Sequence, residues 1–210
     1  MSVIKNIIFD LGGVLLNIDY QKPIDSFKEL GINNIESVFN QFVQNDISIE
    51  YEKGFITDKD FRNHLRAYSN IILTDDWIDK AWNSILLDFP NERFDMLRKL
   101  KSNYALYLLS NTNSLHQQGF NKILSKQIHP LQLENFFIKA YYSHKIGLRK
   151  PDDAIFNFVL NDAAILPNET LYIDDSIQHI ETANRLNFIT HHLKKDEEII
   201  TVINKIISKA

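Results

Sequence analysis

The chain has 210 residues, of which 44% are hydrophobic and 24% are charged, as in a globular protein with one substantial core. Its formal net charge of -4 excludes a broad nucleic-acid-binding surface, because such a surface needs an excess of basic residues. The absence of cysteine excludes disulfides, thiolate metal sites and cysteine nucleophiles. No apolar run approaches the roughly 20 residues that cross a bilayer, and the N-terminus lacks a signal-peptide pattern. We therefore expect a cytoplasmic protein without a membrane partner.

The first predicted strand ends on a carboxylate. Residues 3–9 (VIKNIIF) are rich in β-branched and aromatic side chains, which is typical of a buried strand. Asp10 follows directly, and Gly12 and Gly13 come next. Asp10 either begins a turn or places a charge at the end of the strand for a chemical reason.

A helical segment follows this strand. Residues 20–89 have a helical pattern that no convincing strand interrupts. Two helix starts within it are marked by capping residues, Thr57 and Thr74, each followed by acidic side chains. Asn91 is expected to cap the next helix.

From Asn91 onward, predicted strands alternate with predicted helices. The strands are expected at residues 104–109, 138–142, 170–173 and 188–191. The helices are expected from Pro151 to about Asn161, from Ser176 to Leu186, and at the end of the chain to Ala210. This alternation predicts an α/β fold, in which helices cover both faces of a parallel sheet and a helical segment is inserted after the first strand. The corresponding domains are residues 1–19 with 90–210, and residues 20–89.

Polar side chains follow three of the predicted strands. Asp10, Ser110 and the pair Asp174–Asp175 each come directly after an apolar run. Ligands of open parallel sheets bind beyond the carboxyl ends of the strands, so we expect these side chains to share one edge of the sheet. Lys150, just before the helix expected to start at Pro151, would bring a positive charge there.

This group of residues suits phosphoryl transfer. Three carboxylates in one pocket repel one another unless a cation lies among them, and oxygen ligands suit Mg²⁺. The Ser110 hydroxyl and neighbouring backbone N–H groups would suit phosphate oxygens, and Lys150 would neutralise charge. Taken singly, Ser110 and Lys150 are more often ordinary surface residues, and Asp175 could be a helix cap. Together and in this order, they point to a shared site.

The motifs carried by these residues resemble those of the haloacid dehalogenase (HAD) superfamily. The segments FDLGGVL, LYLLSNTN, IGLRKPD and LYIDDS match its four motifs in order, over essentially the whole chain. Longer stretches resemble the bacterial branch that includes α-D-glucose-1-phosphate phosphatases. The resemblance implies a Rossmann-like core with a mobile helical cap, which residues 20–89 would form.

The resemblance also implies roles for individual residues. Asp10 would attack phosphorus to form an aspartyl-phosphate, while Ser110 and the Asn111 backbone bind phosphoryl oxygens and Lys150 neutralises charge. The metal, Mg²⁺, would be held by a set of four residues: Asp10, the carbonyl of Gly12, Asp174 and, nearby, Asp175. The cap segment Glu52, Lys53 and Gly54 would contact a small phosphorylated metabolite, such as a sugar 1-phosphate.

Gly12 departs from the superfamily pattern. Most HAD phosphatases have an aspartate at this position, which acts as general acid and base. General acid–base help is typically worth 10²–10⁴-fold, so glycine need not abolish turnover, and a sugar 1-phosphate has a good leaving group. Asp19 or Glu52 would be a replacement proton donor, although both are more often solvated. Two alternatives remain: a 2-haloacid dehalogenase, and a catalytically weak HAD relative with a binding or regulatory role.

Overall fold

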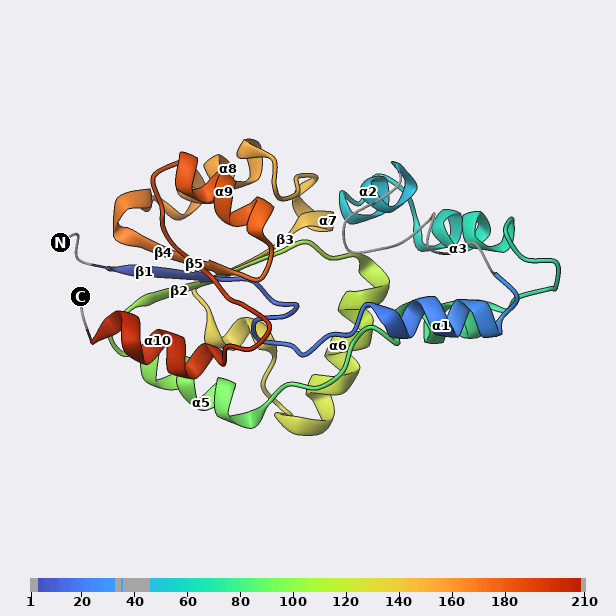
Figure 1. Cartoon of the computed structure of the whole chain (residues 1–210), viewed down its shortest axis with the longest axis horizontal. Coiled ribbons are helices and arrows are strands. Elements are labelled where there is room, and N and C mark those ends of the chain that lie inside the picture. Colours follow the sequence, from blue (N-terminus) through green and yellow to red (C-terminus); the bar gives the residue numbers. More distant parts are fainter. Residues whose placement is uncertain (1–3, 33–34, 36–45, 209–210) are drawn as a thin grey trace.

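The computed structural model describes residues 4–32, 35 and 46–208 (Figure 1). Val3 of the first predicted strand, residues 33–34 and 36–45 of the predicted helical segment, and residues 209–210 lie outside the described residues. Among the described helices, none is both long and apolar enough to span a membrane.

A five-stranded parallel sheet forms the centre of the protein, in the order β3-β2-β1-β4-β5. The strands are β1 (Asn6–Phe9), β2 (Ala105–Ser110), β3 (Lys139–Tyr142), β4 (Thr170–Asp174) and β5 (Ile189–His192). The predicted parallel α/β fold is therefore confirmed. The strands β2 and β4 extend one residue beyond their predicted ends and so include Ser110 and Asp174.

The strand register brings the expected site residues to one level. Phe9 at the end of β1 pairs with Leu108 of β2 on one side and with Ile173 of β4 on the other. Asp10 consequently lies level with Leu109 and Asp174 on the neighbouring strands. The central position of β1 puts these groups in the middle of the carboxyl edge of the sheet.

Helices cover both faces of the sheet (Figure 1). One face packs on α5 (Asn91–Leu100), α6 (Ser114–Gln127) and α10 (Ile199–Ile207), and the other packs on α8 (Asp153–Ala163) and α9 (Ile177–Arg185). Consecutive β1 residues alternate between the two cores, since Ile7 and Phe9 belong to the first and Ile8 to the second. Short elements complete this part: η2 (Leu133–Phe136), α7 (Ser143–Ile146) and η3 (Pro167–Glu169).

The segment between β1 and α5 is helical, as predicted, and has a core of its own. It contains α1 (Gln21–Glu29), α2 (Asp46–Glu52), α3 (Asp58–Arg66) and α4 (Asp75–Asn83). Phe27, Phe61 and Trp82 are almost fully buried in this core, which Leu115 of α6 joins from outside the segment. The segment extends from the carboxyl edge of the sheet (Figure 1).

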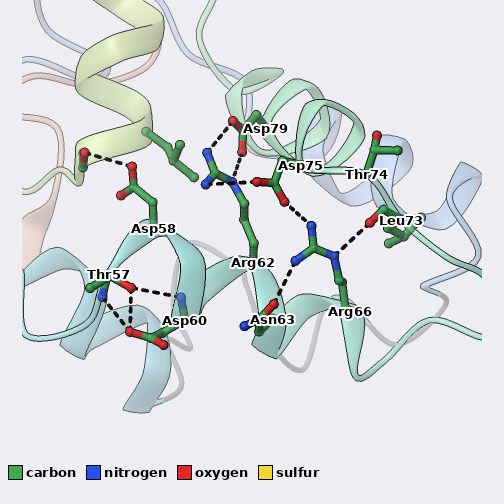
Figure 2. Close-up of polar contacts among 12 residues, drawn as sticks. Thr57, Asp58, Asp60, Arg62, Asn63, Arg66, Leu73, Thr74, Asp75 and Asp79 are labelled. Carbon is green, nitrogen blue, oxygen red and sulfur yellow. Dashed lines mark hydrogen bonds and ion pairs between the residues drawn. The ribbon is translucent and has the colours of Figure 1, made fainter.

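Polar contacts join the helices of this segment (Figure 2). Arg62 of α3 donates to both carboxylate oxygens of Asp79 of α4, at 2.7 Å each. Asp58 of α3 accepts a hydrogen bond from Ser114 of α6 at 3.2 Å, which connects the segment to the rest of the chain. Because Arg62 is largely buried and contacts two oxygens, this pair fixes how α3 and α4 pack.

Two of the three predicted helix caps are confirmed. Thr57 accepts the backbone N–H of Asp60 at 3.2 Å, and the Asp60 carboxylate accepts the N–H of Thr57 at 3.2 Å (Figure 2). Thr74 likewise accepts the N–H of Trp77 at 3.3 Å. The prediction for Asn91 was wrong, because Pro90 is the N-cap and Asn91 is already the first helical residue.

The predicted start of the helix after Lys150 was also wrong. Helix α8 begins at Asp153 with Asp152 as its N-cap, two residues later than expected from Pro151. The backbone N–H of Asp152 donates to the carbonyl of Arg149 at 3.1 Å, so residues 149–152 form a turn. Lys150 thus lies in a tight turn before the helix.

The Thr57 cap provides a stability test. Thr57→Ala removes the oxygen that accepts the Asp60 N–H, and we expect it to lower the free energy of unfolding by about 1 kcal/mol. Thr57→Ser keeps a hydroxyl at the same position and should stay within about 0.5 kcal/mol of the natural chain. Urea denaturation measures both, and equal stability of all three proteins would contradict this role for the cap.

Candidate active site

The ammonium group of Lys150 joins three neighbouring strands at the carboxyl edge of the sheet. Its Nζ lies 2.8 Å from Asp10 Oδ1, 2.6 Å from Asp174 Oδ2 and 3.0 Å from the carbonyl oxygen of Leu109. The Lys150 side chain is fully buried. Its three N–H groups match these three acceptors, and the two carboxylates offset the cost of burying its charge. Although burial alone would lower the pKa of Lys150, Asp10 and Asp174 raise it above its ordinary value.

Asp174 is held by further hydrogen bonds. Its Oδ1 accepts the backbone N–H of Ser176 at 2.8 Å and lies 2.9 Å from Nδ1 of His179. The Tyr172 hydroxyl donates to Oδ2. Burial alone would raise the pKa of Asp174, but Lys150 and His179 hold it below its ordinary value. Asp174 is therefore an oriented, ionised carboxylate.

Asp175 completes a group of three carboxylates. One oxygen each of Asp10, Asp174 and Asp175 lies within 4.8 Å of the others. Burial raises the pKa of Asp10 to about 7, against the lowering effect of Lys150. Burial and the charge of Asp174 raise the pKa of Asp175 to about 6. Burial is the main cause of both shifts, and the neighbouring carboxylates add to them, so a cation among the three carboxylates would favour their ionised forms.

The donor set of this group fits Mg²⁺. Mg²⁺ binds oxygen ligands at about 2.0–2.1 Å and prefers one or two carboxylates with water and phosphate oxygens. The three carboxylates supply such oxygens, and a divalent cation would offset their excess charge. Asp10, Asp174 and Asp175 are the residues that would hold it, and Gly12 lines the same cavity.

Gly13 fixes the position of Asp175. Its φ of +74° is in the left-handed region, which favours glycine. A Cβ at this position would overlap the Asp175 carboxylate. Sequence reasoning singled out Gly12 and gave Gly13 no role, although the pair of glycines was a signal for close backbone approach.

The loop after β2 contacts the Lys150 turn. The Asn111 side chain donates to the carbonyl of Lys150 at 2.8 Å and accepts the Lys150 N–H at 2.9 Å. Thr112 and Ser143 form a similar reciprocal pair at 2.9 Å. The side chain of Asn111, rather than its backbone alone, thus fixes the Lys150 turn beside Ser110, which is itself buried.

A cavity of about 540 Å³ opens onto these groups. The predicted residues that line it are Asp10, Gly12, Glu52, Ser110, Asn111, Lys150 and Asp175. Side chains of the helical segment form part of its wall, including Ser48, Ile49 and Trp82. This volume suits a small organic molecule.

The predicted cap residues differ in their positions. Glu52 lines the cavity and forms an ion pair with Arg149, its Oε2 lying 2.9 Å from a terminal guanidinium nitrogen. Lys53 Nζ lies 3.8 Å from Oδ2 of Asp152, and neither residue is part of the described cavity wall. Gly54 packs against the backbone of His144, where a Cβ would overlap the carbonyl oxygen. All three residues meet the sheet domain, but the described cavity wall includes only Glu52.

Besides Gly13, three residues of this site had no predicted role: Tyr172, His179 and Arg149. Tyr172 and His179 contact Asp174, and Arg149 lines the cavity next to Lys150. Tyr172 has the pattern of a core strand residue, which hides its hydroxyl contact. For His179 the available signal was its position one helical turn after the Asp174–Asp175 pair, and for Arg149 its place beside Lys150.

The parallel sheet agrees with comparisons to known proteins. A family model described as haloacid dehalogenase-like hydrolase matches residues 4–187. The chain therefore belongs to the haloacid dehalogenase-like hydrolases, and the resemblance of its four motifs is confirmed. The chain is accordingly an enzyme of the hydrolase class.

The chain is also similar to individual bacterial proteins. A D-ribitol-5-phosphate phosphatase from Bacteroides thetaiotaomicron is 32% identical over 189 residues, which cover 90% of this chain and 91% of the relative. A HAD family enzyme from the same species, solved as an aspartate-to-alanine variant with magnesium and inorganic phosphate, is 38% identical with a TM-score of 0.87, covering 95% of this chain and 98% of that one. A predicted HAD-like hydrolase from Porphyromonas gingivalis has 32% identity and a TM-score of 0.86, covering 98% of both chains.

The packing of Gly13 against Asp175 leads to a prediction about metal affinity. Gly13→Ala must displace the Asp175 carboxylate, so we expect the affinity for Mg²⁺ to fall roughly tenfold or more. Gly31→Ala is the control, because Gly31 also has a positive φ, +81°, but open space where the Cβ would lie. Each substitution should cost roughly 1–2 kcal/mol of stability through backbone strain.

Isothermal titration calorimetry with MgCl₂ measures the affinity of both variants. Equal affinity of the Gly13 and Gly31 variants would contradict the role assigned to Gly13.

Proposed function

We propose that this enzyme is a Mg²⁺-dependent phosphatase that hydrolyses a small phosphate ester through an aspartyl-phosphate on Asp10. The observation that carries the proposal is the Lys150 bridge between Asp10 and Asp174, beside a third carboxylate and at the base of a cavity. The phosphatase name of one relative and the magnesium and phosphate in a similar structure support it.

In the first step, an Asp10 oxygen attacks phosphorus, a new O–P bond forms, and the bond to the leaving-group oxygen breaks. The leaving alkoxide takes a proton from water or from a cavity side chain. In the second step, water attacks the phosphorus of the aspartyl-phosphate, which releases inorganic phosphate and restores the Asp10 carboxylate. Lys150 donates a hydrogen bond to Asp10 and favours its ionised form before the first step, and it favours the carboxylate again when the second step releases it.

The neighbouring residues bind the phosphoryl group. We assign the Ser110 hydroxyl and the Asn111 backbone to its oxygens, and the positive charge of Lys150 to neutralising the phosphoryl group beside Asp10, since all three residues line the cavity with Asp10. Mg²⁺, held by Asp10, the Gly12 carbonyl, Asp174 and Asp175, would supply charge neutralisation for the phosphoryl oxygens. The assignment of Asp175 is supported by its place in the carboxylate group.

We further propose that residues 20–89 act as a cap over residues 1–19 and 90–210. The separate core of the described helices in this segment supports the division. Because part of the cavity wall comes from these helices, their position over the site would exclude water during the first step.

The substrate is proposed to be a sugar or sugar-alcohol phosphate. The sugar 1-phosphate expected from the resemblance has a good leaving group, which fits Gly12, whereas the relative is named for a primary alcohol ester. Both have a polyhydroxy leaving group, and the cavity volume of about 540 Å³ is in the range of small-molecule sites. A 2-haloacid dehalogenase would not need a carboxylate pair at Asp174 and Asp175.

Replacing the nucleophile tests the proposal directly. Asp10→Asn should lower phosphate release from an aryl phosphate by at least about 10³-fold, because an amide oxygen is a poor nucleophile. Excess EDTA should abolish activity of the natural enzyme, and Mg²⁺ should restore it. Asp25→Asn is a matched control, since the exposed Asp25 accepts a hydrogen bond from the Gln21 side chain and is not part of the described cavity wall. Chloride release from 2-haloacids without phosphate release would support the dehalogenase instead.

Gly12 gives a second prediction. Without an aspartate at this position, kcat/KM should depend strongly on the leaving group, so that aryl phosphates and sugar 1-phosphates react faster than primary alcohol esters. Gly12→Asp should narrow this gap, because it adds a proton donor. A Cβ at Gly12 would lie 3.2 Å from the end of the Ile18 side chain, which must give slightly. A flat series in the natural enzyme would show that another residue already supplies the proton.

A further inference from the structure

The Glu52–Arg149 ion pair connects the cap segment to the residue next to Lys150. Two guanidinium nitrogens of Arg149 reach Glu52 Oε2, at 3.0 and 2.9 Å. The two side chains are 16% and 13% exposed, so the pair is largely shielded from water. Both residues line the cavity. Any molecule that occupies the cavity therefore meets a paired negative and positive charge.

Neighbouring contacts hold Glu52 in this position. Gly54 packs so closely on the His144 backbone that no larger residue fits, and Lys53 lies 3.8 Å from Asp152. Three consecutive cap residues thus meet the core on the same side. These contacts restrain the backbone at Glu52, which cannot move away from Arg149 without breaking them.

The charges along the cavity wall fall into two groups. The first group is the site proposed for phosphate, with Asp10, Lys150 and Asp175. Two histidines also line the wall there. His179 contacts the Asp174 carboxylate, and His192 contacts the Asp175 carbonyl. The second is the Glu52–Arg149 pair, whose formal charges cancel. The described cap residues that share the wall with Glu52 are uncharged: Tyr20, Ser48, Ile49, Trp82, Ile85 and Leu86.

We propose that the Glu52–Arg149 pair selects phosphate esters whose leaving group is an uncharged polyhydroxy chain, and discriminates against leaving groups that carry a carboxylate or a second phosphate. Hydroxyl groups both donate and accept, so they can bind next to a carboxylate and a guanidinium alike. Because the charges of the pair cancel, an anionic leaving group would gain no net attraction to offset the water that it loses in this shielded site, so its binding is weakened. This inference rests on the phosphatase function proposed above and names the substrate class.

The natural enzyme tests the inference without substitution. Ribitol 5-phosphate and ribonate 5-phosphate share a carbon chain and differ in one terminal group, an alcohol in the first and a carboxylate in the second. We expect kcat/KM to be at least about tenfold higher for the uncharged leaving group. The assay measures Mg²⁺-dependent phosphate release, with p-nitrophenyl phosphate as a reference substrate.

The preference of the enzyme is the ratio of kcat/KM for the ribitol ester to kcat/KM for the ribonate ester. Two substitutions should shift this preference in opposite directions. Glu52→Gln keeps the shape and a hydrogen-bond acceptor but removes the negative charge, so the preference should fall at least about fivefold through faster turnover of the ribonate ester. Arg149→Gln leaves the negative charge of Glu52 and should raise the preference. Glu50→Gln, the same chemical change on the same helix but outside the described cavity wall, should leave it unchanged.

The outcomes separate this inference from the proposed function. No phosphate release from any of the three esters would overturn the phosphatase function itself. Phosphate release with the two pentose derivatives within about twofold of each other, or equal shifts of both esters in the Glu52 and Arg149 variants, would overturn the inference alone. The thermal transition shows whether Glu52→Gln folds. If it does not fold, the comparison of the two esters in the natural enzyme and in Arg149→Gln still tests the inference.

Discussion

The contact between Lys150 and two carboxylates organises the carboxyl edge of the sheet. One ammonium group joins the chain after β1, the end of β2 and the end of β4 through Asp10, the Leu109 carbonyl and Asp174. These three acceptors lie level because the parallel strands pair in register, so the sheet itself sets the geometry of the site. Breaking a buried pair of this kind typically costs about 3–5 kcal/mol, since a buried charge loses its partner.

The same contact separates the roles of the carboxylates. Asp174 has additional donors in Ser176 and His179 and stays ionised, whereas the pKa of Asp10 rises to about 7 because burial outweighs the effect of Lys150. A nucleophile needs an ionised carboxylate, and a divalent cation among the three carboxylates would provide the missing positive charge. Binding of a divalent cation would therefore also favour the ionised form of Asp10, which is the form that can attack phosphorus.

Much of this arrangement could be predicted from the sequence, because it depends on where apolar runs stop. The parallel sheet follows from the alternation of strands and helices, and the convergence of Asp10, Ser110 and Asp174 follows from their positions at strand ends. The turn that carries Lys150 was not predictable from Pro151, since proline suits both a first helical turn and the turn before it. Arg149 and Glu52 meet only through tertiary packing, which no local pattern encodes.

The central claim is that Asp10 carries the phosphoryl group during turnover. Rapid acid quench of the enzyme reacting with Mg²⁺ and an aryl phosphate, followed by peptide mass spectrometry, tests it most directly. We expect a phosphoryl group on the Asp10 side chain, at a level that rises within the first turnover. Steady phosphate release with no phosphorylated Asp10 peptide, or with the phosphoryl group on another residue, would contradict it.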